Sequence, residues 1–277
     1  MKSYLRTAIH DPSLMLFAIR HPNHNKIMNY VAGRELLNQP STAFHNDEIL
    51  QKLITDSIDF FHVSTFFETG TFRGDSLRFM INTFGNRLNY YSCEISKNVY
   101  EFAKEKIASD PAAQKVSAKI HVFNQSSPEC VRIALESGLL TEPVLYWLDA
   151  HWYSYWPLLD ELQEILKYSG QTIIVIDDFK IPFHSKFEGG FDKCGDVDND
   201  LGFINSRLKI NESPNRYDII FPNYSSKLAG ANARPRGYAA IYLNFKNEFQ
   251  RFQNSSLLEN FRTLDDTLIS PKPIQNR

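Results

Sequence analysis

The chain has 277 residues, of which 43% are hydrophobic and 22% charged, and its formal net charge is −2 at neutral pH. This length and composition fit one globular domain with an appendage. The small net charge gives no reason to expect a nucleic acid or a membrane as a partner. The three cysteines are scattered and form no metal-binding pattern, and no early segment is typical of a leader or a membrane span. We therefore expect a cytoplasmic protein.

Three parts are expected along the chain. Residues 1–45 are predicted to form a helical N-terminal extension broken by prolines, residues 46–250 the folded domain, and residues 251–277 a C-terminal tail. Within the domain, residues 179–216 interrupt the regular pattern of elements. This segment is predicted to be an insertion with at most one short helix, near residues 201–208.

Continuously apolar strands alternate with amphipathic helices through the domain. A helix is expected after the capping residues Asn46 and Asp47. The strands are predicted at residues 63–67, 89–93, 119–123, 144–148, 172–176, 217–221 and 238–243. Strands that are apolar throughout are typical of a parallel sheet covered on both faces. The sequence thus predicts the α/β class, with a doubly wound, seven-stranded, mostly parallel sheet.

Ligands of such sheets bind at the carboxyl ends of the strands. The first strand is followed by Glu68 and by a turn from Gly70 to Gly74 that leads into a helix. The spacing of the two glycines differs from that of dinucleotide binders, and Glu68 would repel a diphosphate but attract an ammonium group. Glu94 ends the second strand, where an ionised carboxylate can accept hydrogen bonds from both hydroxyls of a ribose.

The segment from Phe67 to Ser76 resembles the first motif of Rossmann-fold S-adenosylmethionine-dependent methyltransferases, and residues 93–95 resemble their ribose-binding motif. In the metal-dependent O-methyltransferases of the catechol, caffeoyl-CoA and macrocin types, a serine likewise follows the second glycine by two residues. In them this serine contacts the methionyl carboxylate, and the residue after the ribose acid packs on adenine. The resemblance implies that one strand near the end, here residues 238–243, is reversed. The cofactor-binding residues that it implies are Glu68, Gly70, Thr71, Gly74, Ser76, Glu94, Ile95, Ser126, Asp149 and His151.

Three aspartates follow two further strands: Asp149 follows the fourth, and Asp177 and Asp178 follow the fifth. So much like charge costs stability unless it is compensated, and Mg²⁺ prefers oxygen ligands of this kind. The O-methyltransferases named above carry acids at the matching places, which implies that these three aspartates hold a metal. Alternatively, Asp149 caps the next helix or binds the acceptor, and Asp177 is a lone acid at a strand end.

His151 is the first candidate for a general base, because an ordinary imidazole pKa of ~6.5 permits the neutral form near neutral pH. Lys180 and His184 compete for this role, and Asp149 is the third catalytic candidate beside His151 and Lys180. The four aspartates between residues 192 and 200 lack the glycine and the glutamate of a calcium loop. They are predicted to form a solvated acidic loop.

These observations predict methyl transfer from S-adenosylmethionine to an oxygen of a small hydroxyl acceptor, with help from Mg²⁺. The N-terminal extension and the insertion would shape the acceptor pocket. A metal-dependent glycosyltransferase is one alternative, since Asp177-Asp178 or Asp196-Val197-Asp198 could hold Mn²⁺, but it leaves Glu68 and the glycine turn unexplained. A noncatalytic nucleotide-binding protein is the other. The assembly is left open, with a homodimer as one option.

Overall fold

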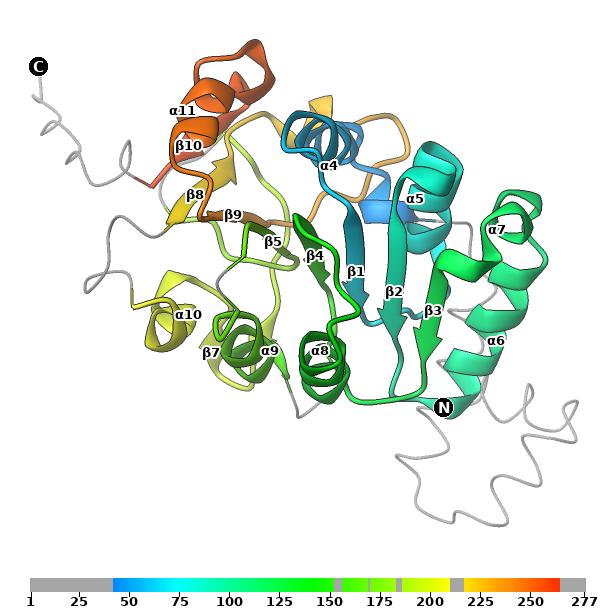
Figure 1. The fold of residues 1–277 in the computed structure, drawn as a ribbon. Helices are drawn as coiled ribbons and strands as arrows, with labels where there is room; N and C mark the ends of the chain where they lie inside the picture. The colour runs from blue at the N-terminus through cyan, green and yellow to red at the C-terminus, as the bar shows by residue number, and fades with distance from the viewer. Residues whose placement is uncertain (1–41, 152–155, 169, 183–185, 210–216, 265–277) are drawn as a thin grey trace, which may run out of the picture. The chain divides into compact units, whose positions relative to one another are not determined.

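The computed structural model of the protein describes residues 42–151, 156–168, 170–182, 186–209 and 217–264. These residues form one sheet with helices on both of its faces (Figure 1). Most of the predicted N-terminal helical extension and the end of the predicted tail lie outside the described residues. No helix in this part of the chain combines the length and the apolar character of a membrane span.

The sheet has eight strands in the order β10-β8-β9-β5-β4-β1-β2-β3. They are β1 (Thr65–Thr69), β2 (Asn89–Cys93), β3 (Ile120–Phe123), β4 (Val144–Leu148), β5 (Thr172–Ile176), β8 (Tyr217–Pro222), β9 (Ala239–Leu243) and β10 (Phe261–Thr263). The strands from β1 to β5 pair in parallel, whereas β9 is antiparallel to both β5 and β8. The doubly wound α/β sheet and the reversed strand are therefore confirmed. The edge strand β10, antiparallel to β8, is one strand more than the sequence predicted.

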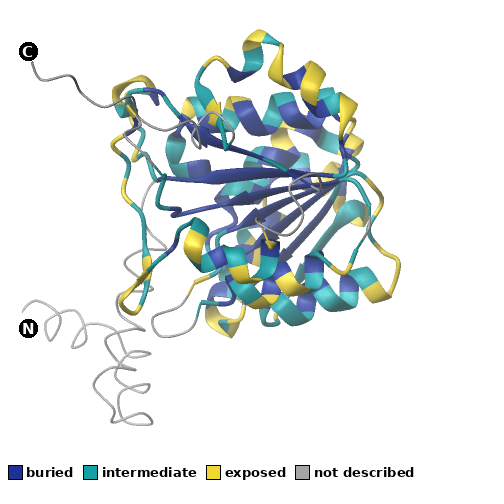
Figure 2. Cartoon of the chain, turned by 90° about the vertical axis from the view of Figure 1, so that its left-hand side faces the viewer, coloured by how far each residue is buried: buried dark blue, intermediate teal, exposed yellow. Residues whose placement is uncertain are grey.

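Two layers of helices cover the sheet. One layer holds α4 (Glu48–Phe60), α5 (Asp75–Phe84), α6 (Lys97–Ala108), α7 (Pro111–Lys115) and α11 (Asn247–Gln253), and the other holds α8 (Ser127–Glu136), α9 (Leu158–Ile165) and α10 (Leu201–Leu208). Short 3-10 turns lie at Ala43–Asn46, Gly85–Arg87, Ser117–Lys119, Ser226–Leu228 and Ser256–Leu258. Figure 2 shows the buried strands between helices that expose their outer sides. In β4, Leu145 and Trp147 pack into the first layer while Val144 and Tyr146 pack into the second, which explains the continuously apolar strand.

The two irregular segments of the sequence have defined structure in their described parts. The insertion contains the antiparallel pair β6 (Lys193–Cys194) and β7 (Val197–Asp198) ahead of α10, whose bounds match the predicted short helix. From residue 251 to residue 264 the chain remains packed against the domain. Phe249 and Phe252 of α11 are buried in the core, and β10 then joins the sheet. The fold thus extends past the predicted start of the tail.

The buried ring of Phe252 gives a test of this extension. We expect Phe252→Ala to lower the free energy of unfolding by ~3–5 kcal/mol, the usual cost of removing a buried phenyl ring. The exposed neighbour Gln250 is the matched control, and Gln250→Ala should change stability by less than about 0.5 kcal/mol. Urea denaturation followed by circular dichroism measures both variants. Equal stabilities would show that α11 is not part of the core.

Candidate functional site

The carboxyl ends of four parallel strands meet at one edge of the sheet. Thr69 of β1 pairs with Cys93 of β2 and with Leu148 of β4, and Leu148 pairs with Ile176 of β5. The residues that follow these strands therefore start side by side. At this edge lie Gly70, Glu94, Asp149 and Asp177.

The turn after β1 depends on its first glycine. Gly70 has a φ of +78°, and a Cβ atom there would lie 2.8 Å from the backbone oxygen of Asp149. The backbone N–H groups of Gly70 and Thr71 both donate to the Cys93 oxygen, at 3.0 and 2.9 Å. Gly74, with a φ of +67°, stands just before α5. The turn is thus held tightly between β2 and β4, and only glycine fits at position 70.

Glu94 connects the glycine turn to the start of α6. One carboxylate oxygen accepts from the N–H of Phe72 at 3.0 Å, and the other from the N–H of Ser96 at 2.8 Å. The side-chain amide of Asn124 donates to the backbone oxygen of Glu94 and fixes the same turn. Ile95, beside it, is 58% exposed. An ordered carboxylate therefore lies next to an open apolar side chain.

Glu68 is buried beneath the glycine turn, with 2% of its surface exposed. The Ser92 hydroxyl donates to its carboxylate at 2.8 Å, and the Thr71 hydroxyl lies 2.6 Å from that of Ser92. Burial raises the pKa of Glu68 to about 8, and the nearby charge of Asp75 adds to this effect. A positively charged group placed beside Glu68 would restore its ionised form.

The two serines predicted to contact the cofactor also lie near this edge. The Ser76 hydroxyl, in the first turn of α5, accepts from the backbone N–H of Phe44 at 3.3 Å. Ser126 occupies the cap position of α8, but its side chain makes no capping hydrogen bond. Both side chains are half-buried. Their predicted contacts with a cofactor stay predictions.

The three aspartates differ in burial. Asp177 and Asp178 are 2% and 4% exposed, whereas the Asp149 side chain is 31% exposed. Desolvation by the surrounding protein, together with the charges of the other two aspartates, raises the pKa of Asp149 well above its ordinary range even though its side chain is partly exposed. Asp177 Oδ1 is buried and has no hydrogen-bond partner among the described residues. A bare carboxylate oxygen in this position is costly unless a cation or a proton compensates it.

Two histidines bind this pair of aspartates. His151 Nε2 lies 3.1 Å from Asp178 Oδ2, and His45 Nε2 lies 2.7 Å from Asp177 Oδ2. The hydrogen bond to Asp178 raises the pKa of His151. Burial lowers the pKa of His45, but the charge of Asp177 outweighs burial, so the pKa of His45 is also raised. The site contains two groups of three possible metal ligands, and within each group the ligand atoms lie within 4.8 Å of one another. One group is His45, Asp177 and Asp178; the other is Asp149, His151 and Asp178. The three predicted metal ligands are thus spread over two groups that each include a histidine.

Arg236 is a further charged residue at this site. Its guanidinium group forms ion pairs with Asp178 and Asp192. Burial alone would raise the pKa of Asp178, but hydrogen bonds from His151 and Arg236 lower it to about 2. Arg236 lies just before β9, and the reversed direction of that strand brings its start to the carboxyl edge, where Ala239 pairs with Ile176.

Neither His45 nor Arg236 was predicted from the sequence to belong to the site. His45 stands 132 residues before Asp177 and carries no local signal that links the two. Arg236 could have been found, because the predicted reversal of the next strand already implied that its start lies at the carboxyl edge.

Lys180 lies in a different environment. Its ammonium group forms an ion pair with Asp198, and its side chain is 44% exposed. Lys193 also binds Asp198, at 2.9 Å. Asp200 caps α10 through the N–H of Phe203. The acidic loop thus makes ion pairs and a helix cap, and the structure does not join Lys180 to the group of aspartates and histidines.

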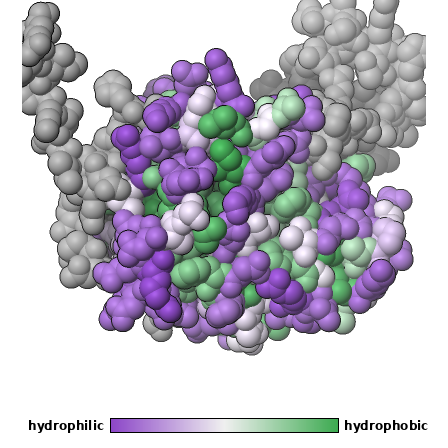
Figure 3. All heavy atoms as spheres, turned by 90° about the horizontal axis from the view of Figure 1, so that it is seen from above, coloured by the Kyte–Doolittle hydropathy of each residue, from purple (hydrophilic) through white to green (hydrophobic). Residues whose placement is uncertain are grey.

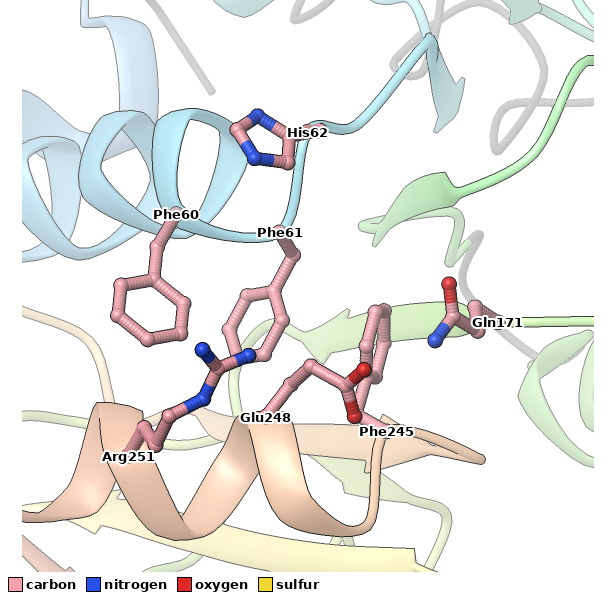
Figure 4. A pocket seen from close by; sticks show the side chains of 7 residues that line it. All are labelled: Phe60, Phe61, His62, Gln171, Phe245, Glu248 and Arg251. Atoms are coloured by element: carbon pink, nitrogen blue, oxygen red, sulfur yellow. The ribbon is translucent and has the colours of Figure 1, made fainter.

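A pocket of about 300 Å³ lies at the opposite edge of the sheet. It is lined by Phe60, Phe61, His62, Gln171, Phe245, Glu248 and Arg251 (Figure 4). Gln171 directly precedes β5 and Phe245 follows the reversed strand β9, so this is the amino edge. Seen from above Figure 1, the surface shows a run of apolar atoms interrupted by hydrophilic side chains (Figure 3). The pocket contains none of the predicted site residues.

Comparisons with known proteins find likeness at the level of structure. No family model and no curated protein matches the chain. The O-methyltransferase TomG from Streptomyces achromogenes, solved in complex with SAM, is 16% identical with a TM-score of 0.46, over 84% of this chain and 90% of its own. The O-methyltransferase from Bacillus cereus, in complex with SAH, is 13% identical with a TM-score of 0.45, over 78% and 96%. Spermidine synthase from Thermotoga maritima is 11% identical with a TM-score of 0.43, over 71% and 60%. The activity must therefore be inferred from the site residues themselves.

The raised pKa of Glu68 gives a test of the site's electrostatics. Because its pKa is about 8 in the folded protein, against 4.5 for an unperturbed glutamate, the folded state retains a proton that the unfolded state loses between these values. The contribution of Glu68 to stability therefore falls as the pH rises from 4.5 to about 8,. Glutamine at position 68 does not titrate. The unfolding free energy of Glu68→Gln minus that of the wild type should therefore increase by at least ~1 kcal/mol from pH 5 to pH 8.

Urea denaturation at the two pH values measures this difference, with Glu101→Gln on the exposed surface of α6 as the control. The control should follow the wild type at both values. If Glu68→Gln does so as well, Glu68 is ionised in the folded protein and the account of its environment is wrong.

Proposed function

We propose that this chain transfers a methyl group from S-adenosylmethionine to an oxygen of a small hydroxyl acceptor. One observation carries the proposal: Glu68, the glycine turn and Glu94 lie along one sheet edge, next to two histidine–aspartate pairs. When bound, the cofactor supplies a sulfonium-activated methyl group that is ready for in-line transfer. The task of the protein is then to hold the cofactor, to align the acceptor and to accept a proton.

The residues after β1 and β2 would hold the cofactor. Each oxygen of Glu94 already accepts one backbone N–H and keeps capacity for a ribose hydroxyl,. The exposed side chain of Ile95 offers an apolar surface for adenine. The ammonium of the methionyl group would favour the ionised form of Glu68. The Ser76 hydroxyl, which already accepts from the N–H of Phe44, would donate to the methionyl carboxylate.

His151 is our candidate for the residue that takes the acceptor proton. Its side chain is 38% exposed, and its ring lies 5.4 Å from that of Trp156. Asp178 orients the ring through Nε2 and stabilises the protonated imidazole that forms,. Lys180 is less suited to this role, because its ion pair with Asp198 keeps the amine protonated.

A divalent cation, Mg²⁺ in the first instance, is the second part of the proposal. Asp177 Oδ1, buried without a hydrogen-bond partner in the described part of the chain, and the adjacent Asp149 fit such an ion. Asp149, Asp177 and Asp178 would hold it, although Arg236 and His151 already occupy both oxygens of Asp178. A bound cation would lower the pKa of the acceptor hydroxyl.

The insertion of residues 179–216 would cover the acceptor side of the site. The side-chain amide of Asn199 donates to the backbone oxygens of Asp177 and Asp178, at 3.0 and 3.2 Å. The backbone N–H of Asp192 donates to the Asp178 oxygen at 3.0 Å. These contacts support the proposal that the insertion helps to bind the acceptor. A glycosyltransferase is less favoured, because the lysine pairs of Asp198 occupy one acid of its possible Mn²⁺ motif.

The cofactor assignment is tested by the binding of S-adenosylhomocysteine. Removing a charged acceptor of hydrogen bonds should weaken binding to Glu94→Ala by ~1.5–3 kcal/mol. Isothermal titration calorimetry measures this loss, and Glu101→Ala on exposed α6 serves as the control. Because Glu94 also holds the turn, the more conservative Glu94→Gln should show a smaller loss. Wild-type affinity in Glu94→Ala would remove the ribose assignment.

The cation is tested by chelation and by a conservative substitution. Formation of S-adenosylhomocysteine with a panel of small phenols and alcohols should stop in EDTA and return with Mg²⁺ or Mn²⁺. Asp177→Asn should lower this rate by roughly 10–100-fold or more. Its affinity for S-adenosylhomocysteine should remain nearly unchanged, because β1 and β2 carry the cofactor site. Full activity in excess EDTA would rule out the cation while leaving methyl transfer in place.

A further inference from the structure

We infer that His45 is a ligand of the divalent cation, together with Asp177 and Asp178, and that the site consequently selects first-row transition ions over Mg²⁺. The possible ligand atoms of these three residues lie within 4.8 Å of one another. An imidazole nitrogen is a good ligand for transition ions and a poor one for Mg²⁺. The inference extends the cation part of the proposed function, but it concerns metal binding and can be tested without methyl transfer.

A strained turn places His45 at the site. Phe44, His45 and Asn46 have φ values of 49°, 57° and 55°, all in the left-handed region that non-glycine residues rarely adopt. Each such residue is unfavourable in isolation and persists only where its surroundings enforce it. Strain of this kind is concentrated at functional sites. The turn therefore has a conformation that its own sequence does not favour.

Packing and hydrogen bonds on both sides hold the turn in place. The ring of Phe44 is buried and meets those of Trp147 and Phe79 edge-on, at 5.0 and 5.6 Å. The backbone N–H of Arg234 donates to the His45 oxygen at 2.9 Å. The side chain of Gln51 donates to the Ala43 oxygen at 3.0 Å. The imidazole is thus presented to Asp177 from a fixed backbone.

A buried oxygen at this point still lacks a partner. His45 Nε2 binds Asp177 Oδ2, but the other oxygen of the same carboxylate is buried without a hydrogen bond among the described residues. The carboxyl group of Asp149 lies beside this carboxylate. Arg236 does not supply the missing cation, since its ion pairs are with Asp178 and Asp192.

A metal ion would satisfy all of these groups together. It would take the bare oxygen of Asp177 and the Nε2 atom of His45, whose proton would be released because a metal binds only the neutral imidazole. The His45 side chain is 25% exposed. The aspartates alone would not distinguish transition ions from Mg²⁺, whereas the imidazole does. Selectivity therefore depends on His45.

Binding of Co²⁺ to the full-length chain tests the inference. Calorimetry and the visible spectrum of bound Co²⁺ should show binding to the wild type that a tenfold excess of Mg²⁺ does not displace. Substitution His45→Gln should weaken Co²⁺ by at least ~10-fold while leaving Mg²⁺ nearly unchanged. The matched control is His62→Gln, because His62 lines the pocket at the amino edge. Wild-type Co²⁺ affinity in His45→Gln, or no Co²⁺ binding by the wild type, would overturn the inference.

A second measurement uses only the wild type, in case the strained turn does not fold with glutamine. Diethyl pyrocarbonate modifies accessible, unligated imidazoles, and peptide mapping by mass spectrometry locates the product. We expect Co²⁺ to protect His45 and Mg²⁺ to protect it much less, while His62 reacts equally in both. Equal labelling of His45 with and without Co²⁺ would contradict the assignment. Binding of S-adenosylhomocysteine to the same preparation reports separately on the proposed function.

Discussion

Parallel strands that end together bring five carboxyl groups to one edge of this sheet. These are Glu68, Glu94, Asp149, Asp177 and Asp178. Carboxylates that are buried beside one another raise each other's pKa and destabilise the fold unless something compensates them. Burial raises the pKa of Glu68 to about 8, and that of Asp149 is raised well above its ordinary range. The arrangement of the rest of the site follows from the need to satisfy these groups.

The chain satisfies the acids in different ways at the two halves of the edge. Backbone N–H groups bind Glu94, and a serine hydroxyl binds Glu68, so these acids are compensated by neutral donors that leave room for a ligand. Two histidines and Arg236 bind Asp177 and Asp178 instead, and Asp177 Oδ1 still has no hydrogen-bond partner among the described residues. The first half therefore suits a nucleoside with an ammonium group, and the second suits proton transfer or a metal ion.

Much of the fold and half of the site could be predicted from the sequence. Apolar runs predicted β4 and β5 with their observed bounds, because strands that are buried on both faces are apolar along their length. Acids directly after these strands could be placed at one edge by topology alone. Contacts between distant segments could not: His45 meets Asp177 only because a left-handed turn folds back onto the sheet. The strand β10 was missed since three residues carry too little pattern.

A crystal structure of the protein with S-adenosylhomocysteine would show directly whether the carboxyl edge of the sheet binds the cofactor. We expect the ribose hydroxyls to bind the carboxylate of Glu94, the adenine to pack against Ile95 and the methionyl amine to lie near Glu68. The ligand would then lie at the carboxyl edge, across the glycine turn. A nucleoside bound instead in the pocket of the amino edge, or no binding at saturating ligand, would contradict the account.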